Sequence, residues 1–293
     1  MHLAKTELPL YLKQKVLDSN KFLEREKLFK HYDINTVCKE AHCPNSARCL
    51  DENTATFLIL GNICSRGCLF CAVEKGKPEA VNKNEVHSIA SVVKQMRLEY
   101  VVITSVCRDD LEDFGAGQFV KTVDAIRLLS RDIKIELLIP DFCGSLDTLK
   151  TVIKSRPECI GHNLETVPRL YSLLNRISAY NRSLEVITRI KKNDSSICVK
   201  SGIMLGLGET EDEVRQVFED LKYAGCDIVT LGQYLSPSVK HFPVKRFLEL
   251  CEFERYREIG LNAGLKHVLS GPLVRSSYKA KETYQLVRQK YSS

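Results

Sequence analysis

Short apolar runs alternate with longer amphipathic segments over most of this chain, beginning at Thr54. The apolar runs have the length and β-branched character of strands that are covered on both faces. We predict strands over 56–60, 100–104, 134–138, 159–162, 199–205, 228–231 and 267–270. Between them apolar residues recur at helical spacing, which predicts helices over 85–97, 118–129, 146–154, 184–191, 211–224 and 245–262. We expect Asn84 and Thr210 to cap helices, and Gly225 and Gly264 to end them.

A strand followed by a helix, repeated about six times, predicts an α/β protein with a parallel sheet. Its form is either a full or partial barrel or an open doubly wound sheet, and in both forms the chemistry lies at the carboxyl ends of the strands. Residues 1–53 lack this period and contain one polar stretch, 21–32, that favours a helix. We therefore expect an N-terminal extension over 1–53, a barrel over 54–270 and a C-terminal tail over 271–293.

The composition of the 293 residues, 44% hydrophobic and 27% charged, is typical of a globular protein and excludes a disordered chain. No run reaches the ~18 apolar residues of a membrane span, and the first residues lack the apolar core of a signal peptide. We expect a cytoplasmic protein that does not bind a membrane. The net charge of +6 is spread along the chain, which argues against a nucleic-acid partner.

Cysteine is the unusual residue, with twelve copies. A chain with an ample core and no export signal does not need a disulfide framework. Six of the cysteines are scattered, and we expect them to pack as small buried hydrophobic residues; they are Cys107, Cys143, Cys159, Cys198, Cys226 and Cys251.

Three further cysteines, Cys64, Cys68 and Cys71, form a C-x3-C-x2-C motif directly after the first predicted strand. Three thiolates can ligate three irons of a cubic 4Fe-4S cluster and leave the fourth iron without a protein ligand. Structural zinc is the alternative, but it requires a fourth Cys or His at fixed spacing. The nearest downstream histidine, His87, lies in a predicted amphipathic helix.

This motif, with the aromatic Phe70 before its last cysteine, resembles that of the radical S-adenosylmethionine (SAM) superfamily. The resemblance implies a partial (β/α)6 TIM-like barrel in which SAM binds the open iron. Cleavage of SAM then supplies a radical that abstracts hydrogen from an unactivated carbon.

A second triplet lies upstream: Cys38, Cys43 and Cys49, in a C-x4-C-x5-C motif. Together with the C-terminal Arg-Ser-Ser-Tyr at 275–278, it resembles the lipoyl synthase family over nearly the whole chain. The resemblance implies an auxiliary 4Fe-4S cluster held by the upstream triplet and Ser277, with Ser276 as the other candidate. Without it, both serines would be interpreted as backbone caps.

The implied activity is that of a sulfurtransferase. The auxiliary cluster supplies two sulfur atoms to carbons 6 and 8 of an octanoyl chain that is attached to a lysine of a lipoyl carrier domain. Such carriers belong to 2-oxoacid dehydrogenases and to the glycine cleavage system, and a low-potential electron donor is also needed. Two alternatives remain: another sulfur-inserting radical SAM enzyme, similar to biotin synthase or a methylthiotransferase, and a non-catalytic zinc or iron–sulfur protein.

SAM requires acceptors for its ammonium and hydroxyl groups and donors for its carboxylate. Candidates at or near strand ends are Thr104, Ser105, Arg108, Glu136, Asn163, Glu165 and Arg176. For Glu136 the alternative is an internal ion pair, and for Arg108 it is a salt bridge with Asp109 or Asp110. Three positions depart from the family pattern, where Asp, Pro and His are usual: Cys107, Ile177 and Lys279.

Overall fold

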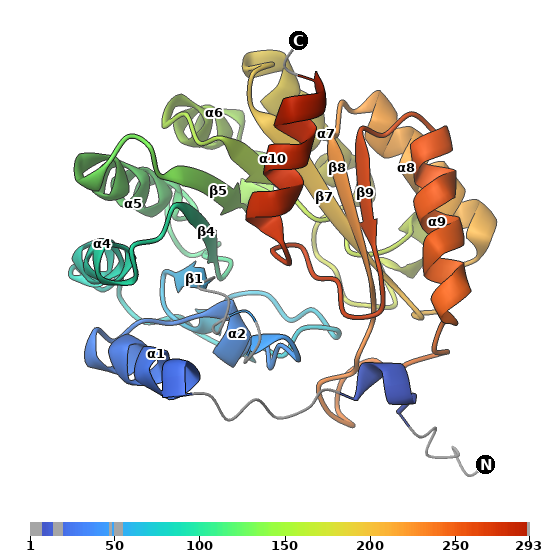
Figure 1. The fold of residues 1–293 in the computed structure, drawn as a ribbon, viewed down its shortest axis with the longest axis horizontal. Coiled ribbons are helices and arrows are strands. Elements are labelled where there is room, and N and C mark those ends of the chain that lie inside the picture. Colours follow the sequence, from blue (N-terminus) through green and yellow to red (C-terminus); the bar gives the residue numbers. More distant parts are fainter. Residues whose placement is uncertain (1–7, 14–19, 47–48, 50–54, 292–293) are drawn as a thin grey trace.

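Seven parallel strands form one curved sheet in the order β1-β4-β5-β6-β7-β8-β9 (Figure 1). The structure is a computed structural model that describes residues 8–13, 20–46, 49 and 55–291. The strands are β1 Thr56–Ile59, β4 Tyr100–Ser105, β5 Lys134–Leu138, β6 Cys159–Gly161, β7 Cys198–Leu205, β8 Ile228–Gln233 and β9 His267–Ser270. Within the described ranges no pairing joins β1 to β9, so the barrel is partial. The predicted strands are confirmed to within two residues at each end.

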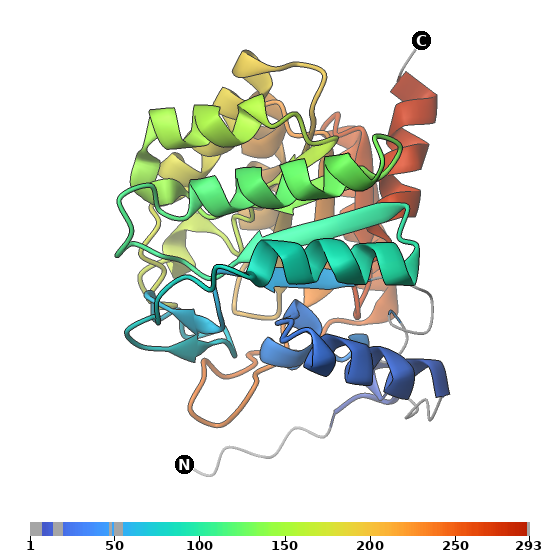
Figure 2. The same ribbon diagram turned by 90° about the vertical axis from the view of Figure 1, so that its left-hand side faces the viewer.

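Six helices follow the first six strands and cover the outer face of the sheet (Figures 1 and 2). They are α4 Glu85–Met96, α5 Ala116–Leu129, α6 Leu146–Lys154, α7 Tyr180–Asn193, α8 Glu211–Tyr223 and α9 Leu250–Asn262. The chain therefore has six β/α units and a seventh strand, which confirms the predicted partial barrel. None of the described helices is both long and apolar enough to cross a membrane.

Helix ends follow the expected capping chemistry at three of the four predicted positions. Thr210 caps α8 by accepting from Glu213 N at 3.3 Å, while the Glu213 carboxylate accepts from Thr210 N at 2.8 Å. Gly225 and Gly264 follow α8 and α9 with φ of +85° and +92°, where a side chain would be strained. Asn84 occupies the predicted N-cap position of α4, but its side chain makes no capping hydrogen bond.

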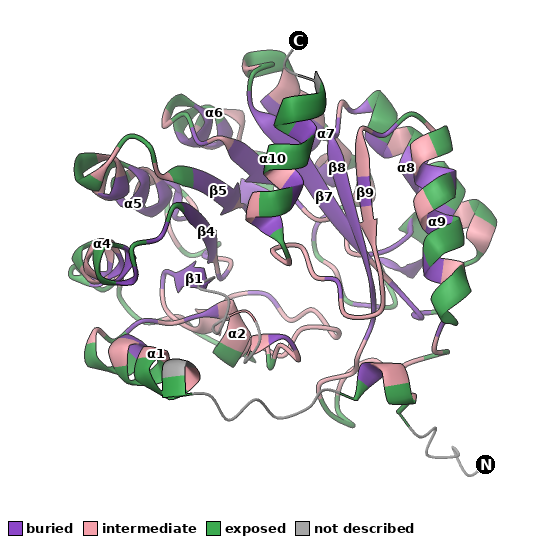
Figure 3. Cartoon of the chain, in the orientation of Figure 1, coloured by how far each residue is buried: buried purple, intermediate pink, exposed green. Residues whose placement is uncertain are grey.

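The core lies between the sheet and its helices, where the strands are buried along almost their whole length (Figure 3). The N-terminal extension packs beneath β1 through α1 Asn20–His31 and α2 Val37–Glu40. Phe29 of α1 meets Phe57 edge-on, with ring centroids 6.4 Å apart, and Thr36 forms an antiparallel bridge to Phe57. The extension is thus fixed to the first strand of the barrel.

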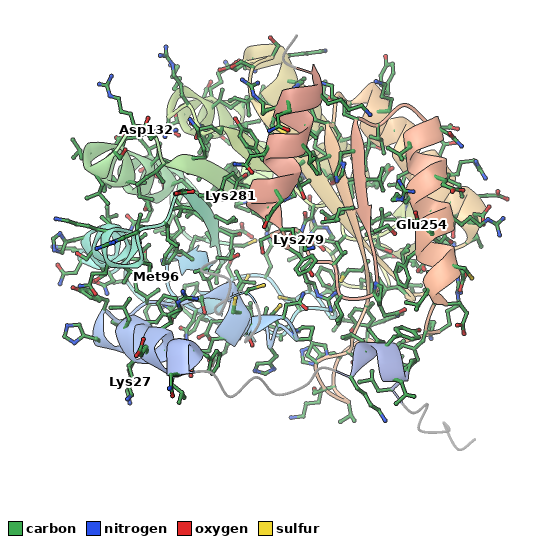
Figure 4. All side chains as sticks on the ribbon, viewed as in Figure 1. Lys27, Met96, Asp132, Glu254, Lys279 and Lys281 are labelled. Carbon is green, nitrogen blue, oxygen red and sulfur yellow. The ribbon has the colours of Figure 1, made fainter. Side chains whose placement is uncertain are left out.

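The last helix, α10 Ala280–Tyr291, lies across the barrel end at which the strands begin. Val287 packs against the first residues of β6, β7 and β8, namely Cys159, Cys198 and Ile228. Lys281, labelled in Figure 4, lies in the first turn of α10 and forms an ion pair with Glu99 beside β4. Because α10 closes this end, the opposite end of the barrel is left for a functional site.

Candidate active site and cluster-binding cavity

A cavity of about 540 Å³ occupies the barrel interior and extends to the carboxyl ends of the strands. Its wall is formed by the loops after β1, β4, β5, β6 and β8, the extension and the C-terminal tail. Both cysteine triplets and both candidate serines line it: Cys38, Cys43, Cys49, Cys64, Cys68, Cys71, Ser276 and Ser277. Segments at opposite ends of the sequence therefore meet in one chamber.

The C-x3-C-x2-C loop is held on both sides by backbone hydrogen bonds. It leaves the short strand β2 Ile63–Cys64, which pairs in parallel with β3 Glu74–Lys75. In the middle of the loop, Leu69 N donates to Leu174 O at 2.9 Å and Leu69 O accepts from Phe242 N at 2.9 Å. These bonds fix the loop between the segments after β6 and β8.

Arg66, inside this loop, is a positioning residue that sequence reasoning missed. The residue is 6% exposed, and its guanidinium pairs with Asp109 and Asp141, at 2.7 Å to each carboxylate. Burial opposes ionisation of Asp141, but the hydrogen bond from Arg66 outweighs it and holds the pKa of that carboxyl well below its usual range. An arginine within a cysteine loop, opposite the acidic pair Asp109 and Asp110, was the available signal.

The thiols differ in their electrostatic surroundings. Burial raises the pKa of Cys38 and of Cys71 to about 12. The pKa of Cys64 is instead lowered to about 6 by interaction with the Cys107 side chain and by the backbone N–H groups of Arg66 and Cys107, which donate to its sulfur at 3.4 Å. Metal ligation by the two buried thiols must therefore displace their protons, so their iron binding depends on pH.

The two cysteine triplets supply donors of the type that iron–sulfur clusters use. Both triplets line the same cavity, and in a cubic cluster each thiolate binds a different iron. Within the described part of the chain, no three Cys, His, Asp or Glu side chains converge as ligands of one metal ion.

The upstream triplet is tied to the C-terminal tail. Cys43 N donates to Cys38 O at 3.1 Å, and Cys49 N donates to Asn45 O at 2.9 Å. Asn45 is buried, and its side-chain amide donates at 2.6 Å to Leu273 O, two residues before the Arg-Ser-Ser-Tyr segment. This bond holds the two candidate serines and the triplet on the same side of the cavity.

The tail itself lies against β8 at a glycine. A Cβ built on Gly232 would stand 2.0 Å from the Val274 carbonyl oxygen, so only glycine permits this approach. Tyr278 N then donates to Arg275 O at 3.0 Å, and this turn presents Ser276 and Ser277 to the cavity. Burial raises the pKa of the Cys43 thiol, and the nearby positive charge of Arg275 opposes that rise.

Five of the seven predicted SAM contacts line the cavity: Thr104, Ser105, Asn163, Glu165 and Arg176. Ser105 Oγ and Arg176 Nε are buried polar atoms without a hydrogen-bond partner among the described residues. Burial raises the pKa of Glu165, and the nearby Arg176 charge opposes that rise. Buried polar atoms that lack a partner along the wall of a cavity suit a polar ligand such as SAM.

The other two predicted contacts lie elsewhere. Glu136 is absent from the cavity wall and forms a buried ion pair with Lys200, Nζ to Oε1 at 2.9 Å. Arg108 is 3% exposed and binds Asp110, with Nη2 to Oδ2 at 2.8 Å. In both cases an internal salt bridge, the alternative to SAM binding, is the observed arrangement.

His162 is a cavity residue that the sequence did not single out. It is 2% exposed, and its Nδ1 lies 2.9 Å from the Ile139 carbonyl, which can only accept a hydrogen bond. The ring therefore carries its proton on Nδ1, and its Nε2 is unprotonated and buried with no hydrogen-bond partner among the described residues. Burial, assisted by the Arg176 charge, lowers its pKa to about 4, so it is a neutral acceptor near pH 7.

The scattered cysteines divide into two groups. Cys159, Cys198 and Cys226 are buried as expected. The prediction is wrong for Cys143 and Cys251, which are exposed, and for Cys107, which is half-buried at the cavity beside Cys64. Apolar neighbours in the sequence do not show where a strand ends. Cys107 follows an apolar run but lies in the loop after β4, which ends at Ser105.

Comparison with known proteins gives concordant matches. A sequence model described as the radical SAM superfamily matches residues 58–221. The lipoyl synthase of Caldicellulosiruptor saccharolyticus is 48% identical over 285 residues, which cover 97% of this chain and 100% of that one. The lipoyl synthase of Chlorobaculum parvum is 47% identical over 282 residues and 96% of each chain.

Solved structures with the same fold are more distant in sequence. Methylornithine synthase (PylB) aligns with a TM-score of 0.52 and 17% identity, over 89% of this chain and 81% of that one. Streptococcus suis SuiB bound to S-adenosylmethionine aligns with a TM-score of 0.55 and 13% identity, over 74% and 50%. At this level of identity the likeness concerns the fold alone.

Proposed function

This chain belongs to the lipoyl synthase family within the radical SAM superfamily, and we propose a specific role for each part of its cavity. Its activity is the insertion of two sulfur atoms at carbons 6 and 8 of an octanoyl chain, with two 4Fe-4S clusters and SAM as cofactors. We assign the radical cluster to Cys64, Cys68 and Cys71. We assign the auxiliary cluster to Cys38, Cys43, Cys49 and Ser277.

One observation supports this assignment above all others: the two triplets and the Arg-Ser-Ser-Tyr segment line a single cavity. When bound, the clusters and SAM supply hydrogen abstraction and the sulfur atoms. The chain's own task is to hold the octanoyl carbons between the two triplets and to exclude water from them. A cavity with Val102, Leu138 and Met204 in its wall suits an alkyl chain.

Around SAM, the proposed contacts are Thr104, Ser105, Asn163, Glu165 and Arg176. Arg176 offers a guanidinium donor for a carboxylate, and Glu165 offers an acceptor for an ammonium group. Thr104 already donates to Leu138 O at 2.7 Å, so its remaining capacity is that of an acceptor. This division of donors and acceptors matches the polar groups of the methionine part of SAM.

The domain division follows the same assignment. Residues 1–53 carry the auxiliary triplet, residues 54–270 the radical cluster and SAM contacts, and residues 271–293 the serine ligand. The proposed substrates are octanoylated carrier domains of 2-oxoacid dehydrogenases and of the glycine cleavage system, with a low-potential electron donor. We further propose that the protein acts in the cytoplasm.

An anaerobic reconstitution tests these assignments. The purified chain should bind about eight irons, the content of two cubic clusters. With a reductant, SAM and an octanoylated carrier, it should form 5′-deoxyadenosine and a carrier heavier by two sulfurs less two hydrogens. Zinc in place of iron would contradict the cluster assignment, and SAM cleavage without sulfur transfer would favour another radical SAM activity.

The serine ligand is tested by a matched pair of variants. Ser277→Ala should reduce sulfur transfer while the radical cluster still assembles, because hydroxyl oxygen is a weaker iron ligand than thiolate and its loss affects only the auxiliary cluster. Ser276→Ala, in the neighbouring position of the same turn, is the control and should retain transfer. The reverse pattern would move the assignment to Ser276.

A further inference from the structure

The inner end of the cavity is closed where the first residue of α10 meets the beginning of β4. Tyr100, Val102 and Ala280 are buried, form one hydrophobic cluster and all line the cavity. The position of Tyr100 is fixed, because its hydroxyl donates to Glu136 Oε2 at 2.7 Å and its ring centroid lies 5.8 Å from that of Tyr284 on α10. This cluster therefore forms an apolar floor at the end of the barrel where the strands begin.

The wall above this floor can hold the end of an acyl chain. Tyr100, Val102 and Thr104 lie two residues apart on β4 and all line the cavity, so they share one face of the strand. At ~3.3 Å per residue, Thr104, a proposed SAM contact, lies ~13 Å from Tyr100 along the strand. An extended octanoyl chain is ~9 Å long, at ~1.3 Å per carbon–carbon bond. The stretch between the SAM contacts and the floor is thus long enough for the distal carbons of such a chain.

A saturated acyl chain has no polar group near its reacting carbons by which a protein could fix their position. Its terminal methyl group is carbon 8, so a wall that stops this methyl also sets the position of carbon 6. Ala280 follows the proposed cluster ligand Ser277 by three residues, and both line the cavity. A stop at Ala280 therefore positions the reacting carbons relative to the segment that holds the proposed sulfur donor.

We propose that Ala280 is a specificity-determining residue whose methyl group stops the terminal carbon of the octanoyl chain and so sets which carbons react. This inference rests on the proposed function. A larger side chain at position 280 should displace the acyl chain toward the carboxyl ends of the strands by about one carbon, because a packed wall leaves no other space. Glycine at this position should admit about one carbon more.

The first test measures binding of acylated peptides to the reconstituted holoenzyme with SAM, by anaerobic calorimetry without reductant. The probes are short peptides that carry heptanoyl-, octanoyl- or nonanoyl-lysine. Ala280→Val should weaken binding of the octanoyl relative to the heptanoyl peptide about tenfold, and Ala280→Gly should strengthen binding of the nonanoyl relative to the octanoyl peptide by a similar factor. Gln285→Val, at an exposed position of the same helix, is the control and should keep the parent order.

The second test follows deuterium from labelled octanoyl chains into 5′-deoxyadenosine after a reductant is added. In each transfer a carbon–deuterium bond of the acyl chain breaks and one forms at the 5′ carbon of the adenosyl group, while SAM is cleaved with one electron from the reductant. The parent should take deuterium from carbons 6 and 8, whereas Ala280→Val should take it from carbon 7 in place of carbon 6.

The proposal is overturned if both Ala280 variants keep the chain-length order and the labelling pattern of the parent. Equal weakening of all three peptides by Ala280→Val, without a change in their order, also counts against it, because that result indicates general damage to the cavity. A parent chain that takes no deuterium from any octanoyl position instead refutes the proposed function.

Discussion

Removal of one partner from the buried Glu136–Lys200 pair should strongly destabilise the chain, whereas removal of both should not. The two side chains extend from β5 and β7 into the barrel, each 2% exposed. Lys200 Nζ lies 2.9 Å from Glu136 Oε1, and the Tyr100 hydroxyl donates to Glu136 Oε2 at 2.7 Å. The test compares Glu136→Leu, Lys200→Met and the double variant.

The expected change in the free energy of unfolding follows from two opposing effects, the attraction between the two charges and the cost of removing them from water. At 2.9 Å the attraction between the charges is ~6 kcal/mol for an effective dielectric constant of ~20. Desolvation costs several kcal/mol for each ion, so the intact pair contributes little net stability. Either single substitution leaves one charge buried and unpaired, at a cost of ~3–5 kcal/mol, out of a total stability of ~5–15 kcal/mol. The double variant replaces both charges with apolar groups and should lie within ~1–2 kcal/mol of the parent.

Urea unfolding of the iron-free chain, followed by circular dichroism, measures these differences in stability as shifts in the urea concentration at the unfolding midpoint. The control is the exposed pair Arg189–Glu185 on α7, for which Arg189→Met should change stability by no more than ~0.5 kcal/mol. Additive effects of the two buried substitutions would refute the argument. The double variant should also cleave SAM, because neither residue lines the cavity; a folded double variant that cannot bind SAM would restore Glu136 as a SAM contact.

Two further predictions concern the cavity and the tail. The pKa of His162 is lowered by burial from 6.5 to about 4, so the folded chain binds fewer protons than the unfolded chain between these pH values, and stability is lost as the pH falls through this window. His162→Gln should therefore reduce the loss of unfolding free energy between pH 7 and pH 4 by ~3 kcal/mol, and an unchanged pH profile would contradict the assigned protonation state. Gly232→Ala should lower the free energy of unfolding by ~1–3 kcal/mol and reduce the iron content of the auxiliary site, because its Cβ would collide with the Val274 carbonyl. Gly76→Ala is the control, since the nearest atom to its Cβ would lie at 3.4 Å. It should change neither urea unfolding nor iron content appreciably.

Much of the barrel could be predicted because parallel strands that are covered on both faces have apolar sequences, and each of these runs is followed by an amphipathic segment. The prediction failed where tertiary hydrogen bonds override a local period. The helix expected over 245–262 begins only at Leu250. Before it, Lys245 N donates to Gly206 O at 2.8 Å and Leu248 N donates to the Gln233 side chain at 3.0 Å, so this stretch is held in a non-helical form against β8 and the loop after β7.

The candidate site divides in the same way. The spacing of the cysteines singled out the two triplets, and both line the cavity, since residues on one loop are close in sequence as well as in space. Glu136 was expected to contact SAM but pairs with Lys200 outside the cavity wall, because a buried carboxylate on a barrel strand can face either the cavity or the closed end, and its position within the strand decides which. The closing element, α10, lies more than a hundred residues later in the chain, and Lys200 approaches from a strand that is not a neighbour of β5 in the sheet. The curvature of the sheet therefore brings Lys200 to Glu136, and a local sequence pattern cannot predict this ion pair.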